Sequence, residues 1–229
     1  MGELIFKHSF SKAIYRIIRD YGFTSCLELG SFDGDGSTQI LIQALSKAPH
    51  PRLVCIEAMP ERFKNLVKNT QDYPWIENHC CSTISSSSFS FLDFDNDIWN
   101  TPFNKLSFQH DEVKGWWERD FAYLKGVSSG YLESSHESFD AVLIDGGEFC
   151  GYDEFRLIKD HTKCLMLNDV FFAFKNNRVH QELLQDKEWK LVYEDHSRER
   201  NGTSIFVRSD LKPLWLRRLL SFFRSKEYR

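Results

Sequence analysis

Short apolar runs alternate along the chain with segments whose apolar residues recur every three or four positions. The runs are predicted as buried strands and the periodic segments as helices, because these spacings gather apolar side chains on one face. The predicted strands span 24–29, 52–57, 76–81, 139–145, 164–169, 189–194 and 203–208. The predicted helices span 5–18, 37–45, 60–69, 152–160 and 176–184. Gly22 can close the first helix, and Pro60 stands where a helix often begins.

Strands that alternate with helices predict an α/β fold, with a parallel sheet and crossover helices. The last two strands are joined only by the short turn 195–202, which predicts that they pair antiparallel. The alternation is interrupted at 85–138, a segment with eleven aromatic residues. Such a long segment is either a lid or binding loop, or a helical decoration with its own small core. One helical face within it would carry Val113, Trp116, Trp117, Phe121 and Leu124.

The net charge of -4 over 229 residues is unevenly distributed. Residues 208–229 hold seven Lys or Arg against two acids, so the rest of the chain is distinctly acidic. An acidic body gives no reason to expect nucleic-acid binding. The tail 211–229 is basic and amphipathic, which suits docking on a membrane surface, on the body itself or on a second copy in a homodimer. We therefore predict one domain over 1–210, which includes 85–138 as an insertion or lid, and a separate tail.

The sequence also bears on the compartment. It has no apolar run long enough to span a bilayer, and its N-terminal residues lack the pattern of a signal peptide. The six cysteines form no CxxC pair and no zinc-ligand spacing, which is typical of reduced thiols. A cytoplasmic protein is therefore expected.

A glycine-rich turn follows the first strand. The pattern ExGxxxGxG runs from Glu28 to Gly36, and 21 residues later Glu57 ends the second strand. Glycines let a ligand approach the backbone, and in a doubly wound sheet a carboxylate in the place of Glu57 lies at the distance of a ribose hydroxyl. The turn differs from the GxGxxG of dinucleotide sites, and its Asp33 and Asp35 would repel a phosphate. A cationic nucleoside such as S-adenosylmethionine (SAM) is therefore favoured over NAD.

This turn resembles that of the class I SAM-dependent methyltransferases. The resemblance covers roughly residues 24–70 and 139–208. It implies a Rossmann-like, doubly wound sheet of seven strands, mostly parallel with an antiparallel last strand. In that family the acid of the first strand and the glycines hold the methionine part of the cofactor, and the acid after the second strand holds the ribose. By position, the implied cofactor-binding residues are Glu28, Gly30, Gly34, Gly36 and Glu57.

A second group of polar residues follows two neighbouring strands. Asp145 ends the strand 139–145, and Asn168 and Asp169 end the strand 164–169. Adjacent parallel strands bring these side chains within coordination reach, and two carboxylates with an amide oxygen suit Mg²⁺. The ion could bind two neighbouring hydroxyls of a substrate and lower the pKa of one. The alternative is that Asp145 caps a turn or contacts the adenine, and that Asp169 places the substrate without a metal.

This group resembles the metal site of the catechol-type and macrocin-type O-methyltransferases, which have an Asp after the fourth strand and an Asp-Asp or Asp-Asn pair after the fifth. Here the pair at 168–169 has the reverse order. Glu148, three residues after Asp145, is the first candidate for the base that accepts the hydroxyl proton. A lysine stands near this position in the catechol-type enzymes. Asp153 and His110 are the alternatives.

The expected function is transfer of a methyl group from SAM to a hydroxyl of a small molecule, for which the resemblance suggests a sugar or polyol. The expected catalytic residues are Glu148 and Asp145, and Mg²⁺ is expected at Asp145, Asn168 and Asp169. Two alternatives stay open. One is an NAD(P)-dependent oxidoreductase, which the missing GxGxxG turn disfavours. The other is a non-catalytic SAM-binding module that is recruited through its tail.

Overall fold

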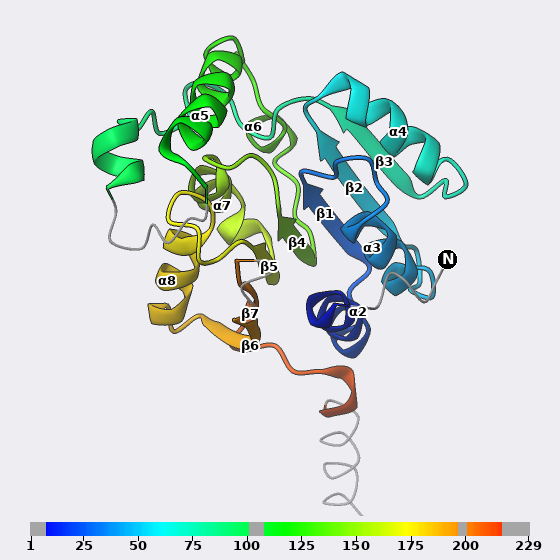
Figure 1. Cartoon of the computed structure of the whole chain (residues 1–229). Helices are drawn as coiled ribbons and strands as arrows, with labels where there is room; N and C mark the ends of the chain where they lie inside the picture. Colours follow the sequence, from blue (N-terminus) through cyan, green and yellow to red (C-terminus); the bar gives the residue numbers. More distant parts are fainter. Residues whose placement is uncertain (1–7, 101–107, 197–200, 217–229) are drawn as a thin grey trace, which may run out of the picture.

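A seven-stranded sheet forms the centre of the computed structural model, which describes residues 8–100, 108–196 and 201–216 (Figure 1). Its strand order is β3-β2-β1-β4-β5-β7-β6. The strands are β1 (Ser25–Leu29), β2 (Arg52–Glu57), β3 (Ile76–Cys80), β4 (Ala141–Ile144), β5 (Cys164–Asn168), β6 (Trp189–Asp195) and β7 (Thr203–Arg208). The pairs among β1 to β5 are parallel, whereas β7 runs antiparallel to both β5 and β6. The predicted fold class is confirmed.

Helices cover both faces of the sheet. The first face carries α2 (Ser9–Tyr21), α3 (Ser37–Leu45) and α4 (Pro60–Thr70). The second carries α5 (His110–Lys125), α6 (Tyr131–Ser135), α7 (Gly151–Ile158) and α8 (Asn177–Gln185). Because side chains alternate along a strand, each strand contributes to both cores. In β1, Cys26 packs under the first set of helices, and Leu27 and Leu29 pack under the second.

The local signals that predict the helix ends are present in the structure. Gly22 closes α2 with a φ of 68°, in the left-handed region that favours glycine, and its N–H donates to carbonyls of the last turn. Pro60 is the first residue of α4. The predicted boundaries differ from the observed ones by a few residues, and the start of the first predicted helix, 5–7, lies outside the described residues.

The segment 85–138 forms a π-helical turn, η1 (Phe94–Trp99), followed by α5 and α6. The predicted apolar face lies on α5, where Val113 and Leu124 are buried and the aromatic residues beside them are partly buried. These side chains join the core that covers the second face of the sheet. The described parts of the segment, 85–100 and 108–138, therefore pack onto the sheet and share its core.

Only the start of the predicted tail falls within the described residues. Leu214 packs on the end of α2, where a Cβ placed on Gly22 would lie 2.8 Å from Leu214 Cδ1. Lys190 Nζ donates to the carbonyl of Leu211 at 2.7 Å. Residues 217–229 lie outside the described residues, so docking through the tail stays a prediction. No helix in the part of the chain that the structure describes is long and apolar enough to cross a bilayer.

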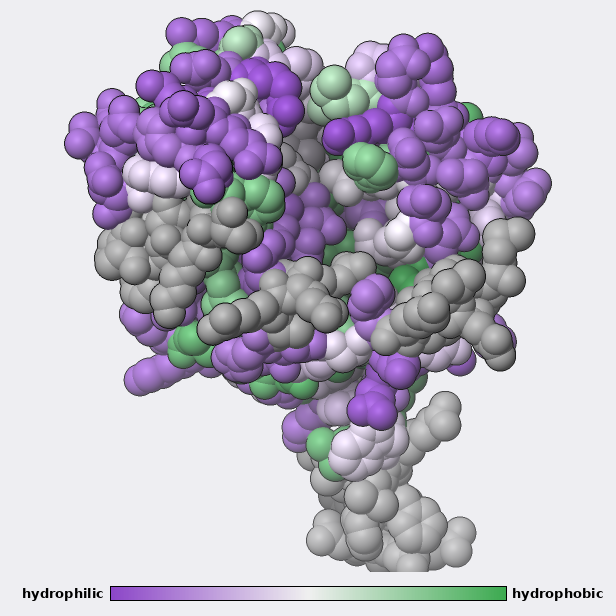
Figure 2. All heavy atoms as spheres, in the orientation of Figure 1, coloured by the Kyte–Doolittle hydropathy of each residue, from purple (hydrophilic) through white to green (hydrophobic). Residues whose placement is uncertain are grey.

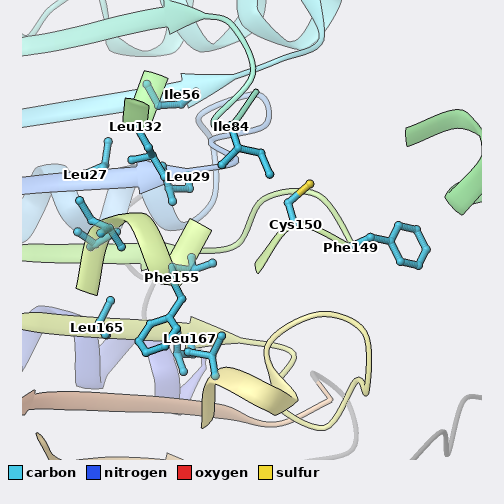
Figure 3. Packing of buried hydrophobic residues seen from close by; sticks show 14 of the residues in the cluster. Leu27, Leu29, Ile56, Ile84, Leu132, Phe149, Cys150, Phe155, Leu165 and Leu167 are labelled. Carbon is cyan, nitrogen blue, oxygen red and sulfur yellow. The ribbon is translucent and has the colours of Figure 1, made fainter. Parts of the chain in front are cut away.

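Phe155 of α7 is a fully buried side chain that lies against Leu165 and Leu167 of β5 (Figure 3). Phe155→Ala should therefore lower the free energy of unfolding by about 3–5 kcal/mol, since it removes apolar contacts and leaves a cavity. Phe91, which is 43% exposed, is the matched control. Phe91→Ala should cost about 1 kcal/mol, mainly from its contacts with neighbouring rings. Urea denaturation of both variants measures the difference, and equal losses would contradict the prediction.

Candidate active site

A cavity of about 840 Å³ opens at the carboxyl ends of β1, β2 and β4. The turn after β1, the end of β2, the turn after β4 and one side of α5 line it. In Figure 2 the surface is hollowed between the part built by α5 and α6 and the part built by α4, with hydrophilic side chains on both sides. Ligands of α/β sheets bind at this edge, where the strand order reverses, and the volume suits a ligand the size of a nucleoside.

The turns that follow β1 and β4 touch at Gly30. This residue has a φ of 85°, and a Cβ placed on it would lie 2.5 Å from Gly146 Cα and 2.6 Å from the carbonyl oxygen of Asp145. A glycine is required at this position both by the dihedral angle and by the space. The absent side chain lets the two turns meet and leaves their backbones at the cavity wall.

The other two glycines of the turn have different surroundings. Gly36 lines the cavity, and a Cβ on it would meet nothing within 4 Å. Gly34 does not line the cavity. Its φ is 74°, and its Cβ would lie 2.8 Å from Leu66 Cδ1 of α4. The structure therefore makes Gly36 available to a ligand, whereas Gly34 allows the close packing of α4, and its contact with the cofactor stays a prediction.

Glu28 is fully buried beneath the glycine turn. Its carboxylate oxygens accept hydrogen bonds from Ser37 Oγ and Thr38 Oγ1, both at 2.6 Å. Burial raises the pKa of Glu28, and the two hydroxyls act in the opposite direction. Glu28 has no exposed surface and does not line the cavity, and its hydrogen bonds hold the first turn of α3. Its contact with the methionine part of a cofactor stays a prediction.

Glu57 ends β2 at the cavity wall, as the sequence predicts. Its Oε2 accepts the N–H of Phe32 at 3.0 Å, and its Oε1 accepts the N–H of Met59 at 2.7 Å. Each carboxylate oxygen can accept a further hydrogen bond. Glu57 therefore fixes the glycine turn against the end of β2 and still presents acceptors to a ligand's hydroxyl groups.

The second predicted group, Asp145, Asn168 and Asp169, is brought together at the ends of β4 and β5. Asn168 Nδ2 donates to Asp145 Oδ1 at 2.8 Å and to Asp169 Oδ2 at 3.2 Å. A lysine that the sequence patterns do not mark lies between the two carboxylates. Lys175 Nζ donates to Asp169 Oδ2 at 2.8 Å and to Asp145 Oδ1 at 3.1 Å. It also lies 3.9 Å from Glu148 Oε1, and its side chain is only 5% exposed.

These side chains, as they lie, do not fit the divalent cation that the resemblance implies. Burial alone would lower the pKa of Lys175, but Asp145, Glu148 and Asp169 raise it above its ordinary value, so a charged ammonium lies among the carboxylates. The amide nitrogen of Asn168 faces the carboxylates, and its oxygen is buried without a hydrogen-bond partner among the described residues. Within those residues, no group of three or more His, Cys, Asp or Glu side chains is arranged to hold a metal.

Glu148 lies on the cavity wall. Burial raises the pKa of Glu148, and the ammonium of Lys175 opposes that shift. The alternatives that the sequence offers, Asp153 and His110, do not line the cavity. The Asp153 carboxylate is buried and accepts hydrogen bonds from Ser90. Of the three candidate bases, Glu148 is the one that a ligand in the cavity can reach.

Parts of the cavity wall carry no signal in the sequence. The start of α2 contributes Phe10 and Ile14, which appear in the sequence only as apolar residues at helical spacing. From the segment 85–138, α5 contributes Arg119, Asp120 and Tyr123. The length and aromatic content of this segment indicate a role in binding, but they do not select these three residues.

Comparisons with known proteins give a match at the level of structure. No protein-family model matches the sequence, and no curated protein matches it. An O-methyltransferase from Bacillus cereus in complex with SAH superposes with a TM-score of 0.57 at 12% identity, over 91% of this chain and 86% of that one. The O-methyltransferase TomG from Streptomyces achromogenes, in complex with SAM, gives 0.55 at 14% identity, over 86% and 78%. A putative caffeoyl-CoA O-methyltransferase from Staphylococcus aureus gives 0.56 at 10% identity, over 90% and 85%.

At these identities the likeness shows the fold alone. The chain has the fold of the SAM-dependent O-methyltransferases, which confirms the fold that the glycine turn and the strand order imply.

Substitution at Gly30 tests how closely the two turns approach. Gly30→Ala should lower the free energy of unfolding by about 1–3 kcal/mol for the dihedral angle alone, and by more for the clash with the turn after β4. Gly36→Ala is the matched control, because open space surrounds that position, and it should cost less than about 1 kcal/mol. Thermal unfolding of the two variants measures the contrast. A Gly30→Ala protein as stable as Gly36→Ala would contradict the geometry.

Proposed function

We propose that this protein transfers a methyl group from SAM to a hydroxyl oxygen of a small molecule. The observation that carries the proposal is the cavity where the turns after β1 and β4 meet, with the carboxylates of Glu57 and Glu148 on its wall. The fold shared with O-methyltransferases solved in complex with SAM or SAH supports the choice of cofactor. The proposal is tested by cofactor binding and by turnover, which can fail separately.

The cofactor would lie against the turn after β1. When bound, SAM would supply a methyl group on a positively charged sulfur, and the carbon–sulfur bond that breaks on transfer would leave neutral SAH. Glu57 would accept hydrogen bonds from the ribose hydroxyls, because the residue lines the cavity and each of its oxygens can accept one more hydrogen bond. Gly30 and Gly36 would let the methionine part approach the backbone. Asp35 and Asp145 also line the cavity, and their charges favour a cationic ligand over a phosphate.

The acceptor would lie between the turn after β4 and α5. Glu148 would receive the hydroxyl proton as the oxygen forms its bond to the methyl carbon, since a raised pKa suits a carboxylate to that role. Asp145 would orient the acceptor by accepting a hydrogen bond from another donor group of that molecule. Arg119 and Asp120 of α5 offer a donor and an acceptor to a molecule with several hydroxyl groups, which fits a sugar or polyol. The segment 85–138 would thus form the acceptor side of the site.

Cofactor binding gives the first prediction. SAM and SAH should raise the melting temperature, whereas NAD should not. Glu57→Gln should weaken SAM binding by roughly 10- to 100-fold, which corresponds to the loss of hydrogen bonds to a charged acceptor. Isothermal titration calorimetry measures the affinity, and Glu61→Gln on the exposed start of α4 is the control. A shift with NAD alone would favour the oxidoreductase and overturn the proposal.

Turnover gives the second prediction. With an acceptor found by following SAH formation over a panel of sugars, polyols and aromatic hydroxyl compounds, Glu148→Gln should lower kcat by roughly 10²- to 10⁴-fold. Its SAM affinity should change less than about twofold, because Glu148 lies on the acceptor side. The exposed Glu118→Gln of α5 is the control and should keep full activity. SAM binding without SAH formation from any acceptor would favour a non-catalytic module.

A further inference from the structure

We propose that the Lys175 ammonium permanently takes the place of the divalent cation, so that this site binds no metal and its reaction needs none. The statement that the reaction needs no metal rests on the proposed function. The statement that the site binds no metal rests on contacts of Lys175, which do not depend on the reaction. Three features of the structure support it: the position of the ammonium, the direction of the surrounding hydrogen bonds and the anchoring of the lysine.

The ammonium lies where the carboxylate oxygens converge. Lys175 Nζ is 2.8 Å from Asp169 Oδ2, 3.1 Å from Asp145 Oδ1 and 3.9 Å from Glu148 Oε1. Carboxylates this close repel one another unless a cation lies among them. An ammonium with hydrogen bonds to two of them supplies that charge from within the chain. A divalent ion would need the same oxygens, and the lysine already occupies them.

The surrounding hydrogen bonds run in the direction that an ammonium needs. Asp169 Oδ1 accepts from Asn201 Nδ2 at 3.0 Å, and Asn168 Nδ2 donates to both aspartates. Both carboxylates thus accept from nitrogen donors, Asp145 through Oδ1 and Asp169 through both of its oxygens. A metal site would require the reverse orientation of Asn168, with its oxygen as a ligand, because cations of this kind bind oxygen.

The lysine is held in place by its own segment. Its neighbour Asn176 is fully buried, and Asn176 Nδ2 donates to the carbonyls of Ile144 at 3.0 Å and Asn168 at 2.7 Å. These carbonyls belong to the last residues of β4 and β5, so the backbone beside Lys175 is tied to both strand ends. The Lys175 N–H donates to the carbonyl of Phe172 at 3.2 Å. The ammonium is therefore built into the strand ends and is not a surface side chain folded inward.

An ammonium in the place of a metal ion limits how the site can hold an acceptor. A metal offers open positions that two neighbouring hydroxyls can occupy together, whereas the buried ammonium donates only three hydrogen bonds. Two of these already go to Asp145 and Asp169. A single hydroxyl that donates its one proton to the carboxylate of Glu148 at the cavity wall is then sufficient for the reaction. Adjacent hydroxyl pairs should have no advantage over isolated ones.

Metal binding by the wild-type protein is the first test, and it needs no turnover. After dialysis against EDTA, Mn²⁺ titrated into the full chain and followed by electron paramagnetic resonance should show no stoichiometric site tighter than about 1 mM. Mg²⁺ and Mn²⁺ should leave the melting temperature unchanged, and EDTA should leave SAH formation unchanged. One Mn²⁺ bound per chain, and lost in Asp145→Asn, would overturn the proposal. SAM binding measured on the same sample tests the proposed function separately.

Removal of the ammonium is the second test. Lys175→Ala should lower the melting temperature by roughly 6–20 °C, as expected when one member of a buried ion pair is lost. The freed carboxylates should then bind Mn²⁺, and Mn²⁺ should restore part of the loss. Lys163→Ala removes an exposed lysine that pairs with Asp140 outside the site, and it should show neither effect. A Lys175→Ala protein with unchanged stability and no affinity for Mn²⁺ would refute the proposal. If this variant does not fold, the Mn²⁺ titration of the wild-type protein is the deciding test.

Discussion

The contact between two backbone turns at Gly30 is the constraint on which the site depends. β1 and β4 are neighbours in the sheet, but the helices that follow them, α3 and α7, pack on opposite faces. The chain therefore leaves the two strand ends in opposite directions, and a cavity opens between the turns. The missing Cβ of Gly30 lets the turns touch at the floor of this cavity. Glu57 then fixes the outer part of the first turn through its bond from Phe32.

The negative charges of the acids at this edge of the sheet are offset by different groups. Each acid therefore has a different role. Hydroxyl groups of α3 compensate Glu28, backbone N–H groups compensate Glu57, and Lys175 compensates Asp145 and Asp169. The ammonium lies 3.9 Å from Glu148 Oε1, which is beyond hydrogen-bond distance. Glu148 Oε2 is buried without a hydrogen-bond partner among the described residues. A carboxylate with so little compensation gains most from taking up a proton, which agrees with its raised pKa.

The fold, and the position of Glu57, Asp145, Asn168 and Asp169 at the strand ends, could be predicted from local patterns, because strand runs, helix periods and the glycine turn each act over a few residues. Contacts made across the fold could not. Nothing adjacent to Glu28 indicates that two hydroxyls of α3 bury it, and nothing near Gly34 indicates that Leu66 packs on it. Lys175 stands in an apolar run after β5, six residues beyond Asp169. A lone lysine among phenylalanines at the ligand edge of a sheet is a signal that could have drawn attention to it.

A cation supplied by the chain changes what the rest of the cavity has to do. A bound metal can both neutralise the strand-end carboxylates and hold the acceptor, whereas Lys175, at 5% exposure, can do only the first. In the proposed reaction the second task would pass to side chains that line the cavity, among them Arg119 and Asp120 of α5. The position of α5 is fixed by Val113 and Leu124, which join the same core as β1 and β4. In the proposed reaction, recognition of the acceptor would therefore depend on the packing of α5 as much as on the strand ends. A substitution at Val113 would then change the binding of the acceptor more than the binding of the cofactor.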